Sequence, residues 1–137
     1  MAANTAPIFS IAGDVQWGAT ALTAANTDRS GIGTVLNVFT AGVDGGFVQK
    51  IRFRAAGSNV ATVARVFINN GSTNTDAVNN NLFDEITLAA STAIETAALP
   101  TYELPLNFAL PPGYTLFVTL GTAVIAGYYI TVIAGKY

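Results

Sequence analysis

Histidine and cysteine are both absent from this sequence of 137 residues. The commonest general base, the commonest metal ligand and the thiol nucleophile are therefore missing. This excludes Ser-His-Asp and Cys-His catalytic arrangements and zinc sites built from those side chains. No disulfide can form. We expect no catalytic residue, no metal site and no cofactor-binding site, and hence a protein that is not an enzyme.

Charge is scarce as well. Charged residues make up 10% of the sequence, against about 25% in a typical soluble domain, while apolar residues make up 51%. A small domain with this composition has little charge repulsion to keep copies apart and carries apolar surface that favours burial against another subunit. We expect a homo-oligomer. The formal net charge of -2 argues against binding a phosphate backbone, so nucleic acid is not expected as a partner.

Long hydrophobic runs are missing too. The longest weakly polar stretch, Thr122 to Gly135, is too short to span a bilayer and contains two glycines. Residues 1–13 have neither the basic start nor the apolar centre of a secretory signal. We therefore expect a soluble protein that has no membrane partner.

What the sequence does contain is a succession of short strand-like segments separated by Gly, Asn, Asp and Pro, with no sustained helical periodicity. This predicts an all-β, single-domain antiparallel β-sandwich, most simply an eight-stranded jelly roll, over residues 14–137. The expected strands are Val15–Leu22, Thr34–Thr40, Phe47–Arg54, Val60–Ile68, Leu82–Leu88, Tyr102–Leu110, Tyr114–Leu120 and Tyr128–Ile133.

Alternation of apolar and polar residues predicts which side chains face the core. The predicted inward residues are Ile51 and Phe53 on one strand, Leu82, Ile86 and Leu88 on a second, and Tyr114, Leu116, Val118 and Leu120 on a third. Glu85, Thr87, Thr115 and Thr119 are expected to face outward. Pro105 cannot donate a ladder hydrogen bond, which predicts an edge or broken strand around it.

Residues 1–13 contain isolated apolar residues without a strand pattern, and we interpret them as an extended N-terminal arm. Its candidate contacts with a neighbouring subunit are Pro7, Ile8, Phe9 and Ile11. A frayed tail is an equally open interpretation. The Asn-rich run 69–81 is either a mobile tip or a contact loop.

Basic residues alternate along one expected strand. Lys50, Arg52 and Arg54 share one face of it, opposite Ile51 and Phe53, and Arg65 is expected on a nearby strand. These four form a candidate protein-docking face, since arginines at an interface make strong bidentate contacts with carboxylates. The simpler alternative is a solvated sheet face, or pairing with Glu85 or Glu103 on neighbouring strands.

Carboxylates show no catalytic arrangement. Asp84 and Glu85 are adjacent on an expected strand and so point to opposite faces. They cannot act together as the two carboxylates of a glycosidase, which must flank the same bond of the substrate. Aromatic residues are frequent late in the chain, where sheet packing is the ordinary explanation and a sugar-binding platform the alternative.

Three segments carry a family resemblance: "GTVLNVFTAG", "GGFVQKIRFRAAGSNVATVARVFINNGS" and "YELPLNFALPPGYTLFVTLGT". They resemble small capsid-associated proteins of tailed bacteriophages, namely the decoration or cement proteins. The resemblance implies a virion structural protein on the capsid exterior, made in the host cytoplasm. It also implies a trimer, or less favourably a dimer, that binds the major capsid protein. The alternatives are a head-fibre or tail-associated β-module and a carbohydrate-binding module.

Overall fold

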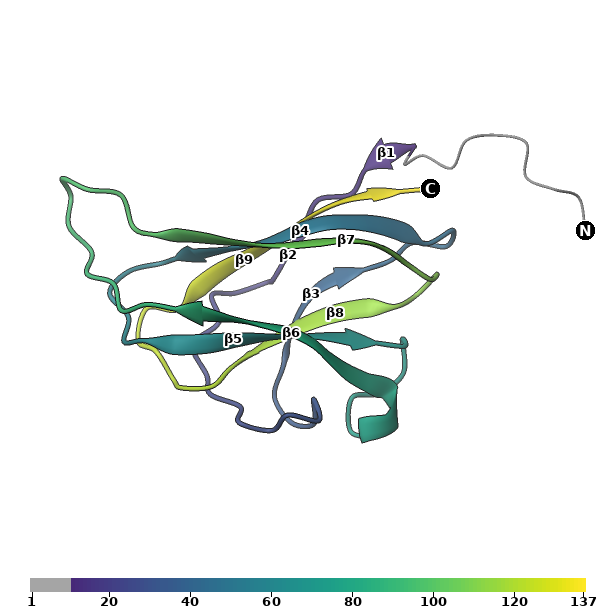
Figure 1. The fold of residues 1–137 in the computed structure, drawn as a ribbon, viewed down its shortest axis with the longest axis horizontal. Coiled ribbons are helices and arrows are strands. Elements are labelled where there is room, and N and C mark those ends of the chain that lie inside the picture. The colour runs from purple at the N-terminus through teal and green to yellow at the C-terminus, as the bar shows by residue number, and fades with distance from the viewer. Residues whose placement is uncertain (1–10) are drawn as a thin grey trace, which may run out of the picture.

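The computed structural model describes residues 11–137, which fold into two antiparallel β-sheets packed face to face (Figure 1). The expected all-β sandwich is confirmed. The strands are β1 (Ala12–Gly13), β2 (Gln16–Trp17), β3 (Leu36–Thr40), β4 (Gly46–Ala55), β5 (Thr62–Asn69), β6 (Asn80–Leu88), β7 (Thr101–Leu110), β8 (Thr115–Leu120) and β9 (Tyr128–Lys136), with a short 3-10 helix at Ala77–Asn79.

Strands that are far apart in sequence pair with one another. One sheet, the β4 sheet, has the order β1-β9-β4-β7, with β2 also pairing with β9. The other, the β5 sheet, has the order β3-β8-β5-β6. Successive strands from β2 to β5 therefore alternate between the sheets, as do β7, β8 and β9. The sheets are built from long-range pairing, and the N-terminal strands lie beside the C-terminal one.

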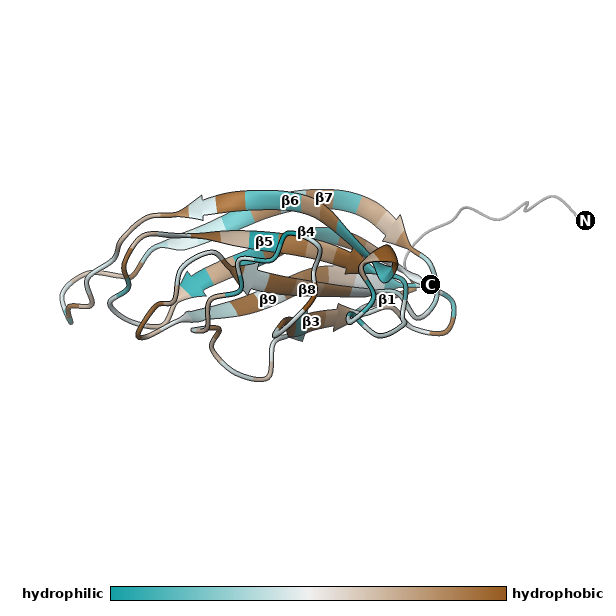
Figure 2. Ribbon diagram, turned by 90° about the horizontal axis from the view of Figure 1, so that it is seen from below, coloured by the Kyte–Doolittle hydropathy of each residue, from teal (hydrophilic) through white to brown (hydrophobic). Residues whose placement is uncertain are grey.

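The core fills the space between the two sheets. Figure 2 shows the brown apolar segments that the strands, such as β8, contribute. Ile51 and Phe53 are fully buried, as their alternation predicted. Burying a side chain such as Phe53 contributes about 1.5–3 kcal/mol. The largest fully buried side chains are those of Tyr128, Phe39, Phe53, Phe67, Phe117, Ile51, Leu88 and Leu116.

One predicted inward residue faces the other way because of a β-bulge. Val66 pairs with Asp84, but Phe67 pairs with Leu82, so Phe83 is an extra residue in β6. An extra residue reverses the alternation of the strand. Leu82 therefore shares the outer face with Phe67, and the expectation that it faces inward with Ile86 and Leu88 was wrong.

Thr119 was expected to be exposed but is 1% exposed. The reason is the long β2–β3 connection, which runs across the outer face of the β5 sheet. The backbone N–H of Asn26 donates to the carbonyl of Leu120 at 2.8 Å, and Arg29 reaches Glu85 on β6. The expectation of one solvated face for β8 was therefore wrong, since both faces of this strand are covered.

The β4 sheet has β7 at one edge and the short strands β1 and β2 at the other. β7 is an edge strand, as the position of Pro105 predicted, and Asn107 within it has a φ of 54°, which disturbs the ladder further. On the opposite edge, Ala12 and Gly13 pair with Lys136 and Gly135 of β9. The last residues of the expected arm thus belong to the sheet.

Candidate protein-binding face

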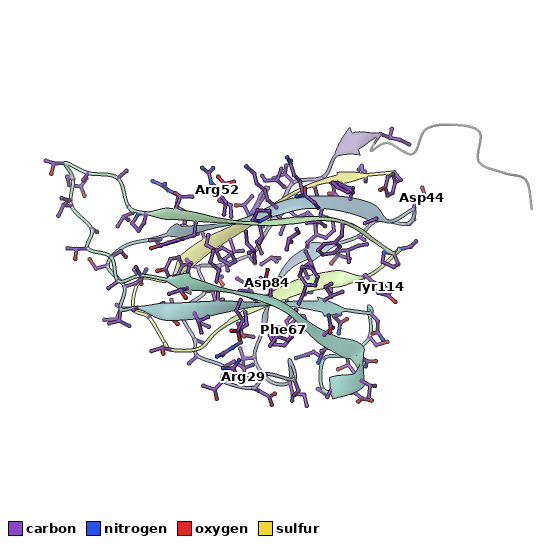
Figure 3. The ribbon with its side chains drawn as sticks, in the orientation of Figure 1. Arg29, Asp44, Arg52, Phe67, Asp84 and Tyr114 are labelled. Atoms are coloured by element: carbon purple, nitrogen blue, oxygen red, sulfur yellow. The ribbon has the colours of Figure 1, made fainter. Side chains whose placement is uncertain are left out.

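The outer surface of the β4 sheet is the candidate site, and β4 sets its chemistry. Lys50, Arg52 and Arg54 alternate with the fully buried Ile51 and Phe53, so all three basic side chains project outward. In Figure 3, Arg52 lies on the outside of this sheet, whereas Arg29 lies beyond the opposite sheet. Three of the four predicted docking residues are thus on one strand and one face.

Neighbouring strands extend this face on both sides. Arg52 pairs in register with Glu103 on β7 and Thr131 on β9, and Arg54 pairs with Thr101 and Tyr129. Because directly opposed residues lie about 5 Å apart, their side chains form a continuous surface. Every position on it is held by hydrogen-bonded strand backbone.

Two exposed aromatic residues complete the surface. Trp17 on β2 is opposite Thr131 and is 68% exposed, and Tyr129 on β9 is 58% exposed. They are diagonal neighbours across the β2–β9 pair, since Thr131 and Tyr129 point to the same side of β9. We call the set Trp17, Lys50, Arg52, Arg54 and Tyr129 the basic-aromatic face.

Gln16 fixes the direction of Trp17. Its side-chain amide donates to the carbonyl of Thr40 at 2.9 Å and accepts from the N–H of the same residue, also at 2.9 Å. These two bonds tie β2 to β3 across the side of the sandwich. Because adjacent strand residues point to opposite faces, Trp17 is left on the outside.

The three basic residues differ in how they are paired. Lys50 forms a salt bridge with Glu103, and its hydrogen bond holds the pKa of that carboxyl below the usual value of 4.5, with the charge of Arg52 acting in the same direction. Arg54 donates to the hydroxyl of Thr101 at 2.8 Å. Among residues 11–137, neither Arg52 nor Arg54 forms a salt bridge. Their charges are available to a partner.

Arg65 does not belong to this face. It lies on β5, in the other sheet, and is 6% exposed. Its Nε donates to Oε1 of Glu85 at 2.9 Å, and Arg29 donates to the same oxygen at 2.7 Å. The grouping of Arg65 with the other three was therefore wrong, and its contacts are those of a structural ion pair.

Of the predicted arm contacts, the structure describes only Ile11. Its backbone N–H donates to the carbonyl of Lys136 at 2.7 Å, while the side chain is 83% exposed. Ile11 is thus held by the sheet and presents an apolar side chain to the outside. Pro7, Ile8 and Phe9 lie outside the described residues.

The Asn-rich β5–β6 connection is organised by its own side chains. Asn74 donates to the carbonyls of Gly31 and Gly33 at 3.0 and 2.9 Å. Asn80 donates to the carbonyls of Ser30 and Asn74. These bonds attach the loop to the β2–β3 connection. Beside it lies a polar groove of about 300 Å³, lined by residues that include Asn37, Asn69, Asn74 and Thr115.

Within the described part of the chain, no group of three or more Asp and Glu residues is placed to hold a metal ion. Asp84 pairs with the core residue Val66 and Glu85 with Arg65, so the two carboxylates face opposite ways, as predicted. No helix among these residues has the length and apolar character needed to cross a membrane.

Sequence reasoning missed Trp17 and Tyr129 as members of the face. A signal was present in the Tyr128-Tyr129 pair, because adjacent residues on a strand cannot both face the core. The sequence contains no signal that Trp17 and Tyr129 lie beside Arg52 and Arg54, because this proximity depends on β9 pairing with both β2 and β4. The sequence matches no protein-family model and no curated protein sequence.

Proposed function

We propose that the chain is a decoration, or cement, protein of a tailed bacteriophage. It is a non-catalytic structural domain that binds the outer surface of the major capsid protein lattice and stabilises the head. The observation that carries this proposal is the basic-aromatic face: Arg52 and Arg54, which form no salt bridge within residues 11–137, lie beside exposed Trp17 and Tyr129. The resemblance of three sequence segments to capsid-associated proteins supports the major capsid protein as the partner.

The residue types of this face support protein binding. Trp, Tyr and Arg are the residues that most often dominate binding energy at protein interfaces, where large side chains bury much surface and guanidinium groups pair with carboxylates. Because the face is built on strands, little ordering entropy is lost on binding. The partner surface that it fits carries exposed Asp and Glu.

We also infer that strands β2 to β9 form a jelly roll. The sheet orders are β2-β9-β4-β7 and β3-β8-β5-β6. In each sheet a strand from the start of the chain pairs with one from its end, β2 with β9 and β3 with β8. This arrangement is what results when a long antiparallel ribbon folds over into two sheets with Greek-key connections.

A head made of many capsid subunits would be braced by many copies of this compact domain, each adding a modest contact.

Stabilisation of the head follows from mass action. A domain that binds the assembled lattice, and not the dissociated subunits, lowers the free energy of the assembled state by an amount that grows with its concentration. No covalent step is needed, which agrees with a chain that has neither His nor Cys.

The direct test is co-sedimentation of the purified protein with empty capsids of the phage that encodes it. We expect the wild-type protein to bind, and Arg52→Glu to weaken binding by about 100-fold because a cation opposite carboxylates becomes an anion. Lys136→Glu is the matched control: it makes the same charge change at an exposed residue of β9, away from the face. Equal binding by both variants, or no binding by the wild type, would refute the proposal.

A carbohydrate-binding module is the second candidate, because Trp17 and Tyr129 form an exposed aromatic pair on a sheet surface. Sugar stacking depends on the aromatic rings and little on charge or salt. Glycan-array binding that is lost in Trp17→Ala and retained in Arg52→Glu would favour this function. A head-fibre or tail module would keep the same face and differ in its position on the particle.

A further inference from the structure

Two neighbouring side chains on the outer face of the β5 sheet have polar atoms that are buried and unpaired. Within residues 11–137, neither Nη1 of Arg65 nor Oγ1 of Thr119 forms a hydrogen bond, even with the other. Arg65 is 6% exposed and Thr119 is 1% exposed. A buried polar atom without a partner costs free energy, so folded proteins give nearly all such atoms one. These two atoms therefore call for a partner from outside the chain.

The strand register brings the two side chains together. Arg65 on β5 pairs directly with Thr119 on β8, and the next pair, Val66 with Val118, is fully buried in the core between the sheets. Because adjacent strand residues point to opposite faces, Arg65 and Thr119 both point outward. The Cβ atoms of directly opposed residues lie about 5 Å apart. A single small ligand is thus within reach of both side chains.

Gly121 leaves a narrow space beside the guanidinium of Arg65. It follows β8, and its N–H donates to the carbonyl of Val63 at 2.9 Å, so it continues the pairing with β5. A Cβ at this position would lie 3.3 Å from Nη1 of Arg65 and 2.7 Å from Cγ1 of Val63. Any side chain here would crowd Nη1, whereas glycine leaves that side of it open. Since even one carbon atom is a tight fit, only a very small ligand suits this space.

The β2–β3 connection encloses the space from the outside. The N–H of Asn26 donates to the carbonyl of Leu120 at 2.8 Å, and Ala25 forms an isolated bridge with the same residue. Arg29, farther along the connection, lies outside the β5 sheet (Figure 3) and reaches Glu85 on β6. A ligand held beneath this connection is shielded from solvent, as internal waters and ions are.

The charges around this space favour a negative ligand. Nε of Arg65 and Nη1 of Arg29 donate to the same oxygen, Oε1 of Glu85, at 2.9 and 2.7 Å, so two guanidinium groups share one carboxylate. Asp28 precedes Arg29 but is exposed, and its carboxylate accepts the N–H and the hydroxyl of Ser30. A guanidinium N–H only donates and a threonine hydroxyl can donate, so the ligand is a hydrogen-bond acceptor. The excess cation favours an acceptor that is an anion.

We propose that Nη1 of Arg65 and Oγ1 of Thr119 bind one small hydrogen-bond acceptor beneath the β2–β3 connection, beside Gly121. Chloride supplies this chemistry with the charge that the two arginines favour, and an internal water molecule supplies it without charge. The ligand bridges β5 and β8 and fixes the guanidinium that holds Glu85. The site is independent of the proposed capsid attachment, because it lies on the other sheet and uses no residue of the basic-aromatic face.

Crystallography of the full-length protein locates the ligand. In crystals grown with sodium chloride, we expect one isolated peak of electron density within hydrogen-bonding distance of Nη1 of Arg65 and Oγ1 of Thr119. Replacing chloride with bromide identifies its source: an anomalous peak shows the anion, and an unchanged peak without anomalous signal shows water. The absence of a peak, or a protein group bonded to either atom in its place, would overturn the proposal.

Thr119→Val tests the site in solution, because the exchange removes the hydroxyl and keeps the branched shape of the side chain. Without a ligand, valine would replace a buried unpaired hydroxyl and leave the melting temperature unchanged or raised. With the ligand bound, we expect the melting temperature to fall by at least about 2 °C, because the ligand loses one of its bonds.

Thr131→Val is the matched control, since it makes the same exchange at a partly exposed position of β9, in the other sheet. We expect its melting temperature to change by less than about half as much. A melting temperature of Thr119→Val at or above that of the wild type would contradict the proposal. A density peak that stays unchanged in crystals of Thr119→Val would also contradict it, because Oγ1 would then not be one of the binding atoms.

Discussion

Asn59 holds Gly127 from both sides: its Oδ1 accepts the glycine N–H at 2.8 Å, and its Nδ2 donates to the glycine carbonyl at 3.0 Å. The two residues are 68 positions apart in the sequence. A single side chain thus reinforces the backbone hydrogen bond from Ala56 to the carbonyl of Gly127, at 2.9 Å, that joins the β4–β5 and β8–β9 loops. Its amide is suited to this role because it offers both an acceptor and a donor.

Asn59→Ala should therefore be among the most destabilising polar substitutions in this protein. It leaves the backbone N–H of Gly127 without its partner, while the carbonyl keeps its hydrogen bond from the N–H of Ala56 at 2.9 Å, and we expect it to lower the free energy of unfolding by about 1–3 kcal/mol. Urea denaturation followed by circular dichroism would measure this. A loss below about 0.5 kcal/mol would mean that the network does not stabilise the loops.

Gly45 and Gly113 provide a second, paired prediction. Both have positive φ, 82° and 77°. A Cβ on Gly45 would lie 2.7 Å from the carbonyl oxygen of Leu110, whereas one on Gly113 would meet nothing within 4 Å. We expect Gly113→Ala to cost about 1–2 kcal/mol from backbone strain alone, and Gly45→Ala to cost at least about 1 kcal/mol more. Equal melting temperatures for the two variants would contradict the close approach to Leu110.

The ion pair beneath the β2–β3 connection gives a third prediction. Glu85→Ala leaves the buried guanidinium of Arg65 without its carboxylate, and should cost about 2 kcal/mol of stability because Glu85 itself is partly exposed. Arg29→Ala removes only the exposed partner of the same carboxylate, and should cost less than about 1 kcal/mol. Thermal denaturation of both variants checks the order, and a larger loss for Arg29→Ala would reverse the assignment.

Glu103 supplies a dependence on pH. The pKa of Glu103 is lowered in the folded protein, chiefly by the hydrogen bond from Lys50. The ionised carboxylate therefore stabilises the folded state at neutral pH, and this stabilisation is lost as the pH falls through the folded pKa. Lys50→Met should raise the pKa of Glu103 towards its ordinary value. Carbon-detected NMR titration of the carboxyl group measures this, and an unchanged pKa in Lys50→Met would show that Lys50 is not the cause.

Local patterns in the sequence were sufficient for most of the strands, but the expected strand Val15–Leu22 was wrong in extent, because only Gln16–Trp17 forms a strand there. The alternation around Ile51 and Phe53 predicted the buried face of β4, and Pro105 predicted an edge strand. Both depend on neighbours within a few residues. Leu82 failed because the bulge at Phe83 arises from pairing with β5, and the pattern of β6 alone does not contain it.

The site was less predictable because it is assembled across strands. Arg65 was grouped with Arg52 on the basis of sequence proximity, but consecutive strands β4 and β5 lie in different sheets. Conversely, Trp17 and Arg54 are 37 positions apart in the sequence and meet the same strand, β9. Which strands become neighbours is decided by the packing of the whole chain.

The most direct measurement of the proposed decoration role is an electron-microscopy map of the phage particle to which we propose that this chain belongs. We predict density for this domain on the capsid exterior, with the basic-aromatic face against the major capsid protein and carboxylates within hydrogen-bonding distance of Arg52 and Arg54. A particle that lacks the domain, or a map in which Trp17 and Arg52 point into solvent, would contradict the account.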